Sequence, residues 1–357
     1  MTSIKDVAQL AGVSVTTVSH VLNKTRAVHV DTEARVLEAV RTLGYVPSAV
    51  ARSLKMKATH TIGMLVPNNS NPYFAELVRA VEDACFAAGY ALLLCNTDDN
   101  ADRQRVYLDV LAQKRVDGVI VASTTDDERM SRHLADSTMP MVLIDRDIDG
   151  LARPCVQTDH VAGGAMATGH LLALGHRRIA CIAGPEQLHS SESRVQGWRE
   201  AMQRVGLEAD LLVYADFTVN GGYLAMLELL RRDTTTAAAA RLTAVFACND
   251  LMAMGALRAV HEQGLRVPQD VALVGYDDIE LASYTQPALA TVAQPVRLMA
   301  KEALACLLAL MSGAKGAPRP APVQGMLQLL APSLVTRASS GRALERTEPF
   351  VVSGQMM

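Results

Sequence analysis

Residues 4–23 read IKDVAQLAGVSVTTVSHVLN, which predicts two short amphipathic helices separated by a tight turn. Ser3 and Ser14 stand in the position of helix N-caps, and Gly12 supplies the stop between the helices. The apolar side chains of the second helix recur on one face: Val18, Val21 and Leu22. A helix, a tight turn and a second helix form the layout that places the second helix in the major groove of DNA.

The second helix turns three polar side chains away from its apolar face: Thr16, Thr17 and His20. Hydroxyl and imidazole groups can bond base edges. Four cations are available for phosphates, which position a protein without specifying sequence: Lys5, Lys24, Arg26 and Arg35. Helix spacing alone leaves open a three-helix protein-binding domain with a solvated polar face.

Charge is distributed unevenly along the 357-residue chain, whose net charge is −3. Residues 1–60 carry eight Lys and Arg against four Asp and Glu, whereas the remainder carries 26 against 33. A basic head on an acidic body indicates a nucleic-acid contact confined to the N-terminus. A third helix is expected in this head, capped by Asp31; Ala34, Leu37, Val40, Arg41 and Leu43 follow helical spacing until Gly44 stops it.

From Ile62 onward, short apolar runs alternate with longer helical patterns, for example IGMLV followed by residues 74–88. Two of the later helices are expected over Ala162–Leu174 and Glu192–Val205. This alternation predicts parallel sheets with helices on both faces. About ten strand signals fit two α/β lobes better than one sheet. We expect lobe 1 at about 60–160 plus 293–336, lobe 2 at about 161–290, and a loose tail over 338–357.

Composition restricts the class of protein. Hydrophobic residues make up 50% of the chain and charged residues 20%, which is typical of a globular protein. The six cysteines have no C-x-x-C spacing and are expected to be reduced thiols. The N-terminus lacks the apolar stretch of a signal peptide, and no apolar run is long enough for a membrane span. We therefore expect a cytoplasmic protein with no membrane contact.

The head resembles that of the LacI/GalR family of bacterial repressors. The resemblance covers residues 3–57 and rests on TTVSHVLN and PSAVARSLK at the family's separation. It implies a DNA-binding domain over 1–57, with a hinge over about 48–56 that becomes helical only on operator DNA. It also implies DNA contacts by Thr16, Thr17, His20, Tyr45, Leu54 and Lys55. Leu54 would wedge into the central base step from the minor groove. Two heads on a palindrome imply a homodimer.

The body, over about 60–336, resembles two-lobed periplasmic sugar-binding proteins and the effector domain of the same family. The motifs include NNSNPYF at 68–74, SRVQGW at 193–198 and VGYDDIELASY at 274–284. These polar clusters follow predicted strand ends, where open α/β sheets bind ligands. The candidate effector residues are Asn71, Tyr73, Phe74, Asp145, Arg146, Arg194, Phe217, Asn249, Asp277 and Gln294.

The chemistry of these candidates suits a polyol. Carboxylates and amides bond pairs of hydroxyls, guanidinium groups supply fork donors, and aromatic rings cover the apolar faces of a sugar. Their match to ribose-binding proteins implies a ribose-like effector. The purine-responsive branch of the family carries an Arg where this chain has Leu188, which argues against a nucleobase.

Other functions remain as alternatives. An enzyme is disfavoured because no G-x-S-x-G elbow and no obvious acid/base pair of carboxylates appear. No nucleotide fingerprint is present, and we expect no cofactor and no metal. A transport-type binding protein is disfavoured by the DNA-binding head. Whether the effector is an inducer or a co-repressor, and whether it is another sugar, stays open at this point.

Overall fold

The computed structural model describes residues 2–46, 58–122, 128–146, 151, 153–186, 188–233, 241–313 and 327–341. The chain forms two compact units, one over residues 1–60 and the other over 61–357. Two features expected from the sequence lie outside the described residues: the hinge at 48–56 and the part of the tail beyond 341.

The N-terminal unit contains helices α1 (Ile4–Ala11), α2 (Val15–Asn23) and α3 (Val30–Thr42). The caps follow the sequence signals. The Asp6 carboxylate accepts from the Ser3 backbone N–H at 2.8 Å, and Ser14 Oγ accepts from the Thr17 N–H at 3.1 Å. Gly12 ends α1 with φ +64°, a conformation that glycine adopts without strain. The small core contains Val7, Ala8, Ala11, Val18, Val21, Val36 and Ala39.

The third helix differs from the sequence expectation at its cap, while Val40 and Leu43 pack against the head core as the spacing allows. It begins at Val30, with His29 at the cap position, so Asp31 lies in its first turn. Leu37 is 42% exposed, whereas Val36 and Ala39 are buried. The apolar residues of this helix fit more than one helical stripe, and packing against α1 selects the stripe through Val36 and Ala39.

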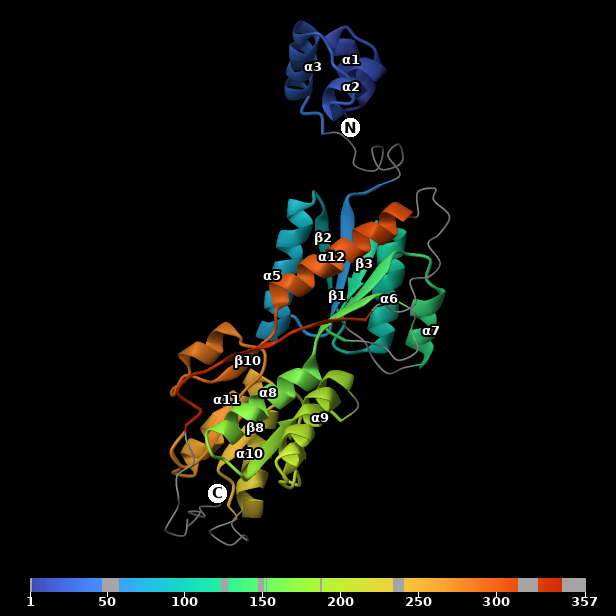
Figure 1. The fold of residues 1–357 in the computed structure, drawn as a ribbon. Coiled ribbons are helices and arrows are strands. Elements are labelled where there is room, and N and C mark those ends of the chain that lie inside the picture. Colours follow the sequence, from blue (N-terminus) through green and yellow to red (C-terminus); the bar gives the residue numbers. More distant parts are fainter. Residues whose placement is uncertain are drawn as a thin grey trace. The chain divides into compact units, whose positions relative to one another are not determined.

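Lobe 1 of the second unit is built on a six-stranded parallel sheet in the order β11-β5-β4-β3-β1-β2 (Figure 1). The strands are β1 (Thr61–Val66), β2 (Ala91–Asn96), β3 (Gly118–Val121), β4 (Met141–Ile144), β5 (Cys155–Thr158) and β11 (Leu327–Leu330). The helices are α5 (Pro72–Ala87), α6 (Ala101–Gln113), α7 (Glu128–Asp136) and α12 (Val296–Gly313).

Successive residues of the central strands enter two different cores. Met64 and Ile120 belong to the core that includes residues of α5 and α12, whereas Leu65 and Val121 belong to the core on the α6 side. Both faces of the sheet are therefore covered, which explains why these strands are continuous apolar runs.

Lobe 2 is built on a four-stranded parallel sheet in the order β7-β6-β8-β9. The strands are β6 (Ile179–Ala183), β7 (Leu212–Tyr214), β8 (Ala244–Ala247) and β9 (Ala272–Val274). The helices are α8 (His160–Ala173), α9 (His189–Arg204), α10 (Val219–Asp233) and α11 (Asp250–Glu262). Helix α8 packs on α9 and α10 packs on α11. The strand order reverses between β6 and β8, so right-handed crossovers place the two helix pairs on opposite faces.

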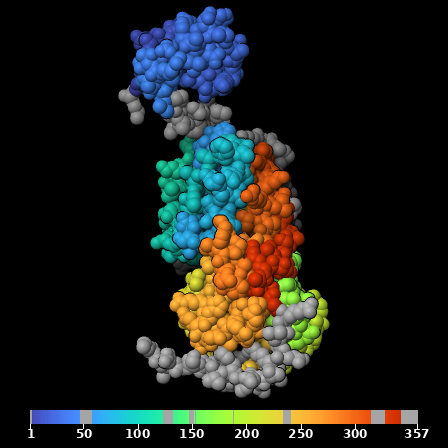
Figure 2. Space-filling model, turned by 90° about the vertical axis from the view of Figure 1, so that its left-hand side faces the viewer, coloured from blue at the N-terminus to red at the C-terminus, as the bar shows by residue number. Residues whose placement is uncertain are grey.

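The described chain crosses between the lobes at three places. It enters lobe 2 between β5 and α8, returns between β10 (Thr291–Ala293) and α12, and leaves β11 again for β12 (Ser333–Val335). Strands β10 and β12 pair antiparallel. In Figure 2 the orange and red C-terminal residues accordingly cover surface on both lobes.

The end of the described chain corrects the expected position of the tail. Ser339 is fully buried; its carbonyl accepts from the Leu273 N–H at 2.9 Å and its hydroxyl donates to the Leu273 carbonyl at 2.7 Å. Arg337 bonds Asp278 at 2.7 Å. Residues 337–341 therefore pack on lobe 2, and a loose tail cannot begin at 338.

Candidate functional site

A cavity lined by residues of both lobes lies between them. Nine of the ten effector residues expected from the sequence line it, together with one residue that was not expected, Ser190. The lining residues are Asn71, Tyr73, Phe74, Asp145, Arg146, Ser190, Arg194, Phe217, Asn249 and Asp277. All of them follow the carboxyl ends of parallel strands, where ligands bind in open α/β sheets.

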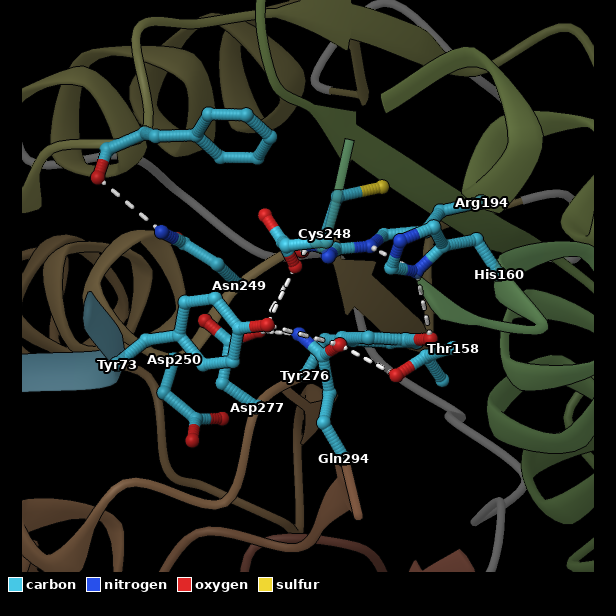
Figure 3. A network of polar contacts seen from close by, with 12 residues as sticks. Tyr73, Thr158, His160, Arg194, Cys248, Asn249, Asp250, Tyr276, Asp277 and Gln294 are labelled. Carbon is cyan, nitrogen blue, oxygen red and sulfur yellow. Dashed lines mark hydrogen bonds and ion pairs between the residues drawn. The ribbon is translucent and has the colours of Figure 1, made fainter. Parts of the chain in front are cut away.

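The tenth expected residue, Gln294, connects the two lobes beside the cavity (Figure 3). Its Oε1 accepts from Thr158 Oγ1 at 2.7 Å, and its Nε2 donates to Asp277 Oδ1 at 2.8 Å. The Tyr73 hydroxyl lies 3.3 Å from Gln294 Oε1 and donates to the Asp145 carboxylate. The crossing strands therefore link the acidic residues of both lobes.

Arg194 is fixed on several sides by groups of lobe 2. Its Nη1 donates to the Cys248 carbonyl, and the guanidinium carbon lies 4.0 Å from the centre of the Tyr276 ring. Asp277 Oδ1 is 3.8 Å from Nη1, and both side chains are almost fully buried. The geometry preorganises a fork of donors at the cavity wall.

Two asparagines of the cavity also cap helices. Asn71 Oδ1 accepts from the Tyr73 N–H at 3.1 Å at the start of α5, and Asn249 Oδ1 accepts from the Met252 N–H at 2.8 Å at the start of α11. Asn249 Nδ2 also donates to the Phe217 carbonyl at 3.1 Å. Because their carbonyls are occupied, these side chains can offer a ligand N–H donors.

Three residues of the cavity have left-handed backbone conformations: Asp145 at φ +70°, Phe217 at +61° and Asp277 at +110°. Such conformations cost about 1–3 kcal/mol each and cluster at functional sites. The Phe217 ring also occupies the space beside Gly184, where a Cβ would lie 2.1 Å from the ring. The surrounding structure imposes these conformations, and Gly184 leaves the space that the Phe217 ring occupies.

Burial dominates the ionisation of the acidic residues. It raises the pKa of Asp277 to about 7, although the nearby Arg194 charge and the Gln294 hydrogen bond oppose the shift. Burial also raises the pKa of Asp145, against the charge of Arg146 and the Tyr73 hydrogen bond. The site therefore holds two carboxyl groups whose charge is costly until a ligand hydrogen-bonds them.

The head presents the expected DNA-facing residues on α2. Thr16 is exposed, whereas Thr17 and His20 are half-buried; His20 Nδ1 lies 2.8 Å from Thr25 Oγ1. Tyr45 follows α3 and packs partly against the head core. Leu54 and Lys55 lie outside the described residues.

Sequence reasoning missed Ser190, which lines the cavity, and His160, which contacts Arg194 behind it; both stand in first helical turns. The expected starts of α8 and α9 were Ala162 and Glu192, but the helices begin at His160 and His189. The side chain of Asp159 accepts from the Ala162 N–H at 2.8 Å, so an N-cap signal for His160 was present. Helix α9 has no side-chain cap, and nothing local marked Ser190.

Within the described ranges, no group of three or more His, Cys, Asp and Glu side chains is arranged to hold a metal ion. No helix in the described part of the chain has the length and apolar character of a membrane span. The six cysteines are free thiols.

Comparison with known proteins matches both units of this architecture. Residues 3–48 match the model of bacterial regulatory proteins of the lacI family, and residues 59–306 match that of periplasmic binding proteins and the sugar-binding domain of the LacI family. The chain belongs to the LacI family. This LacI-family protein is therefore a DNA-binding transcriptional repressor by family, and its relatives are regulators and not enzymes.

Two curated relatives are almost equally similar to this LacI-family chain. The ribose operon repressor of Escherichia coli K12 is 45% identical over 285 residues, covering 78% of this chain and 84% of the relative. The repressor PurR of Pasteurella multocida is 44% identical over 282 residues, covering 78% and 83%. The solved Lac repressor dimer bound to operator and the anti-inducer ONPF has a TM-score of 0.84 at 29% identity, covering 95% of this chain and 99% of that chain.

Proposed function

We propose that this protein binds a palindromic operator as a homodimer, represses sugar-utilisation genes, and is released by a small neutral sugar, most simply D-ribose. The observation that carries the proposal is the cavity, in which carboxylates and guanidinium groups from both lobes stand among aromatic rings. Similarity to a ribose operon repressor and to an operator-bound Lac repressor dimer supports it.

The charges of the cavity favour an uncharged ligand. Arg146 bonds Asp99 at 2.7 Å, and Arg194 lies 3.8 Å from Asp277. Each guanidinium group thus lies within 4 Å of an acidic side chain of the protein, and Asp145, 3.9 Å from Arg146, adds a second acidic group that would oppose a phosphate. A free sugar fits this site better than a sugar phosphate.

The aromatic rings of the cavity lie beside its cationic groups. Phe74 and Phe217 lie under the guanidinium groups of Arg146 and Arg194, 5.5 and 5.8 Å from the ring centres. Apolar rings beside fixed donors suit the alternating faces and edges of a sugar.

A purine effector is the competing candidate, because a PurR repressor is 44% identical to this chain. Leu188 stands at the helix-cap position of α9, half-buried, and its side chain provides no hydrogen bond to a nucleobase. This position favours the sugar.

For the DNA-bound state we propose base contacts from Thr16, Thr17 and His20, and a backbone contact near Tyr45. We further propose that Leu54, with Lys55 beside it, wedges into the central base step from a hinge over 48–56. We propose that the sugar binds the DNA-free form more tightly than the DNA-bound form. It must then weaken operator binding by the ratio of its two affinities, typically 5- to 150-fold.

The test uses the full-length protein and fluorescence anisotropy with the DNA upstream of its own gene. Calorimetric titration against D-ribose, D-xylose, D-glucose, ribose 5-phosphate and hypoxanthine runs in parallel. We expect ribose to bind and to weaken the operator complex, and ribose 5-phosphate not to bind. Hypoxanthine binding that tightens the operator complex would instead establish a purine co-repressor.

The wedge has its own test. Leu54→Ala should reduce specific operator affinity at least tenfold and leave ribose affinity unchanged. Without the apolar wedge the DNA is not bent, and the protein–DNA contacts that the bend permits are lost. Parallel loss of both affinities would indicate a folding defect and contradict the proposed role.

A further inference from the structure

His160 is a buried, titratable side chain that does not line the cavity. It is the first residue of α8, directly after the chain crosses from β5 into lobe 2, and only 3% of it is exposed. Figure 3 shows its ring beside the guanidinium of Arg194 and above Tyr276. The side chain therefore stands behind the donor fork of the effector site.

The contacts of His160 fix its tautomer. Arg194 Nε donates to His160 Nδ1 at 3.3 Å, and the Tyr276 hydroxyl lies 3.1 Å from the same atom. A guanidinium Nε always carries its hydrogen, so Nδ1 is an acceptor and the imidazole proton belongs on Nε2.

The surroundings also keep this ring uncharged. Burial lowers the pKa of His160 well below its ordinary value, and the charge of Arg194 lowers it further, while a backbone interaction with Asp145 opposes part of the shift. A protonated ring would bring two cations into contact in a buried place. A neutral acceptor orients Arg194 without neutralising it.

The other contacts of Arg194 act on its Nη1 atom and on one face of the guanidinium. The Cys248 carbonyl accepts from Nη1, Asp277 Oδ1 lies 3.8 Å from the same nitrogen, and the Tyr276 ring covers one face. The bond to His160 fixes the Nε side of the guanidinium. With Nε and one Nη1 hydrogen engaged, the remaining N–H groups are left for the cavity that Arg194 lines.

We propose that His160 is a positioning residue of the effector site: as a neutral imidazole protonated on Nε2, it sets the orientation in which Arg194 donates to the effector. The proposal rests on the effector cavity proposed above. It gives a role in effector binding to a residue that does not line the cavity.

Two variants at position 160 separate the effect of the hydrogen-bond acceptor from the effect of the side-chain volume. His160→Asn places an amide oxygen near the position of Nδ1, whereas His160→Leu fills the space without an acceptor. His170→Asn is the matched control, since His170 lies on the same helix and bonds Ser340 away from the cavity. Calorimetry with D-ribose should give wild-type affinity within threefold for His160→Asn and for the control, and a 10- to 100-fold loss for His160→Leu.

Spectra of the ligand-free protein test the His160–Arg194 contact without depending on which sugar binds. ¹⁵N spectra of the full-length protein should show a neutral His160 protonated on Nε2. They should also show a slowly exchanging Arg194 Nε–H that persists in His160→Asn and disappears in His160→Leu. If these signals appear but ribose does not bind, the proposed effector is wrong and the positioning role stands. A proton on Nδ1, or wild-type ribose affinity in His160→Leu, overturns the inference.

Discussion

Asp277 lines the cavity with a carboxyl group whose ionisation destabilises the ligand-free fold. Its carboxyl group is buried, its pKa is raised to about 7, and its backbone has φ +110°. A group that keeps its proton longer in the folded than in the unfolded state stabilises the fold at low pH. That contribution is lost as the pH rises from about 4 through about 7. The residue therefore lowers the stability of the ligand-free protein at neutral pH in return for a hydrogen-bonding carboxylate.

Replacing Asp277 with Asn should make the ligand-free protein more stable and the site weaker. At pH 8 we expect the free energy of unfolding to rise by about 1–4 kcal/mol, because the amide cannot ionise. Ribose affinity should fall at least tenfold. Urea unfolding at pH 5 and pH 8 and calorimetric titration provide the measurements. The stability gain must shrink towards pH 5; a gain of equal size at both pH values would contradict this account.

At the scale of single residues, the sequence predicts the lining of the cavity better than the support behind it. The lining residues follow strand ends in an order that matches sugar-binding proteins, so Asp145 and Asn249 could be identified from motifs. Tyr276 and His160 are recognised only when the fold brings β5, α9 and β9 together. Their partners, such as Arg194, are more than thirty residues away in sequence.

At the scale of elements, the contact between α8 and α9 depends on small residues. A Cβ at Gly164 would lie 2.1 Å from the Arg194 carbonyl oxygen, and a Cβ at Gly197 would lie 2.1 Å from the Val161 carbonyl oxygen. The close approach of these helices brings Arg194 to the position where His160 can accept from it.

Gly164→Ala should therefore destabilise the protein by about 1–3 kcal/mol, because overpacking forces the helices apart. It should also weaken ribose binding, since α9 carries Arg194. Gly169→Ala on the same helix is the control: nothing lies within 4 Å of its Cβ, and the change should stabilise by about 0.5–1 kcal/mol. Thermal unfolding and ribose titration of both variants test the pair. Destabilisation by the two substitutions alike would exclude the proposed contact.

A second element-scale prediction concerns the start of α2. Ser14 Oγ accepts from the Thr17 N–H and contacts Thr17 Oγ1 at 2.9 Å. Ser14→Ala should cost the head about 1 kcal/mol and leave the unfolding temperature of the effector unit unchanged. Differential scanning calorimetry of the full chain can resolve the two transitions. An equal shift of both transitions would show that the units unfold together.

Helix starts also mark where sequence-based reasoning fails. The central strands are predictable as continuous apolar runs, because they are buried on both faces, and most helices are predictable from their apolar periodicity. Periodicity identifies the apolar middle of a helix and misses polar first turns. His160 and Ser190 lie in such turns and were therefore not predicted. In α3 the spacing allowed several stripes, and only contact with α1 selected the stripe through Val36.

At the scale of the whole molecule, the basic head attached to an acidic body predicts salt-dependent operator binding. If several phosphates are neutralised, the logarithm of the operator affinity should fall linearly with the logarithm of salt concentration, with a slope of about −0.9 per phosphate. Between 50 and 200 mM salt we expect a loss of at least 100-fold, measured by anisotropy. Ribose affinity should stay constant over the same range, and a flat operator response would contradict the assigned phosphate contacts.

Because the chain crosses between the lobes three times, truncation near the C-terminal residues affects both lobes. Neither lobe is encoded by one continuous stretch, since α12 and β11 complete lobe 1 after lobe 2 has been made, and residues 337–341 then return to lobe 2. A premature stop after residue 290 would leave lobe 1 without an edge strand and a covering helix. It would also expose the face that Ser339 closes. During synthesis, lobe 1 cannot reach its final packing before residues 327–330 have been made, nor lobe 2 before residues 337–341.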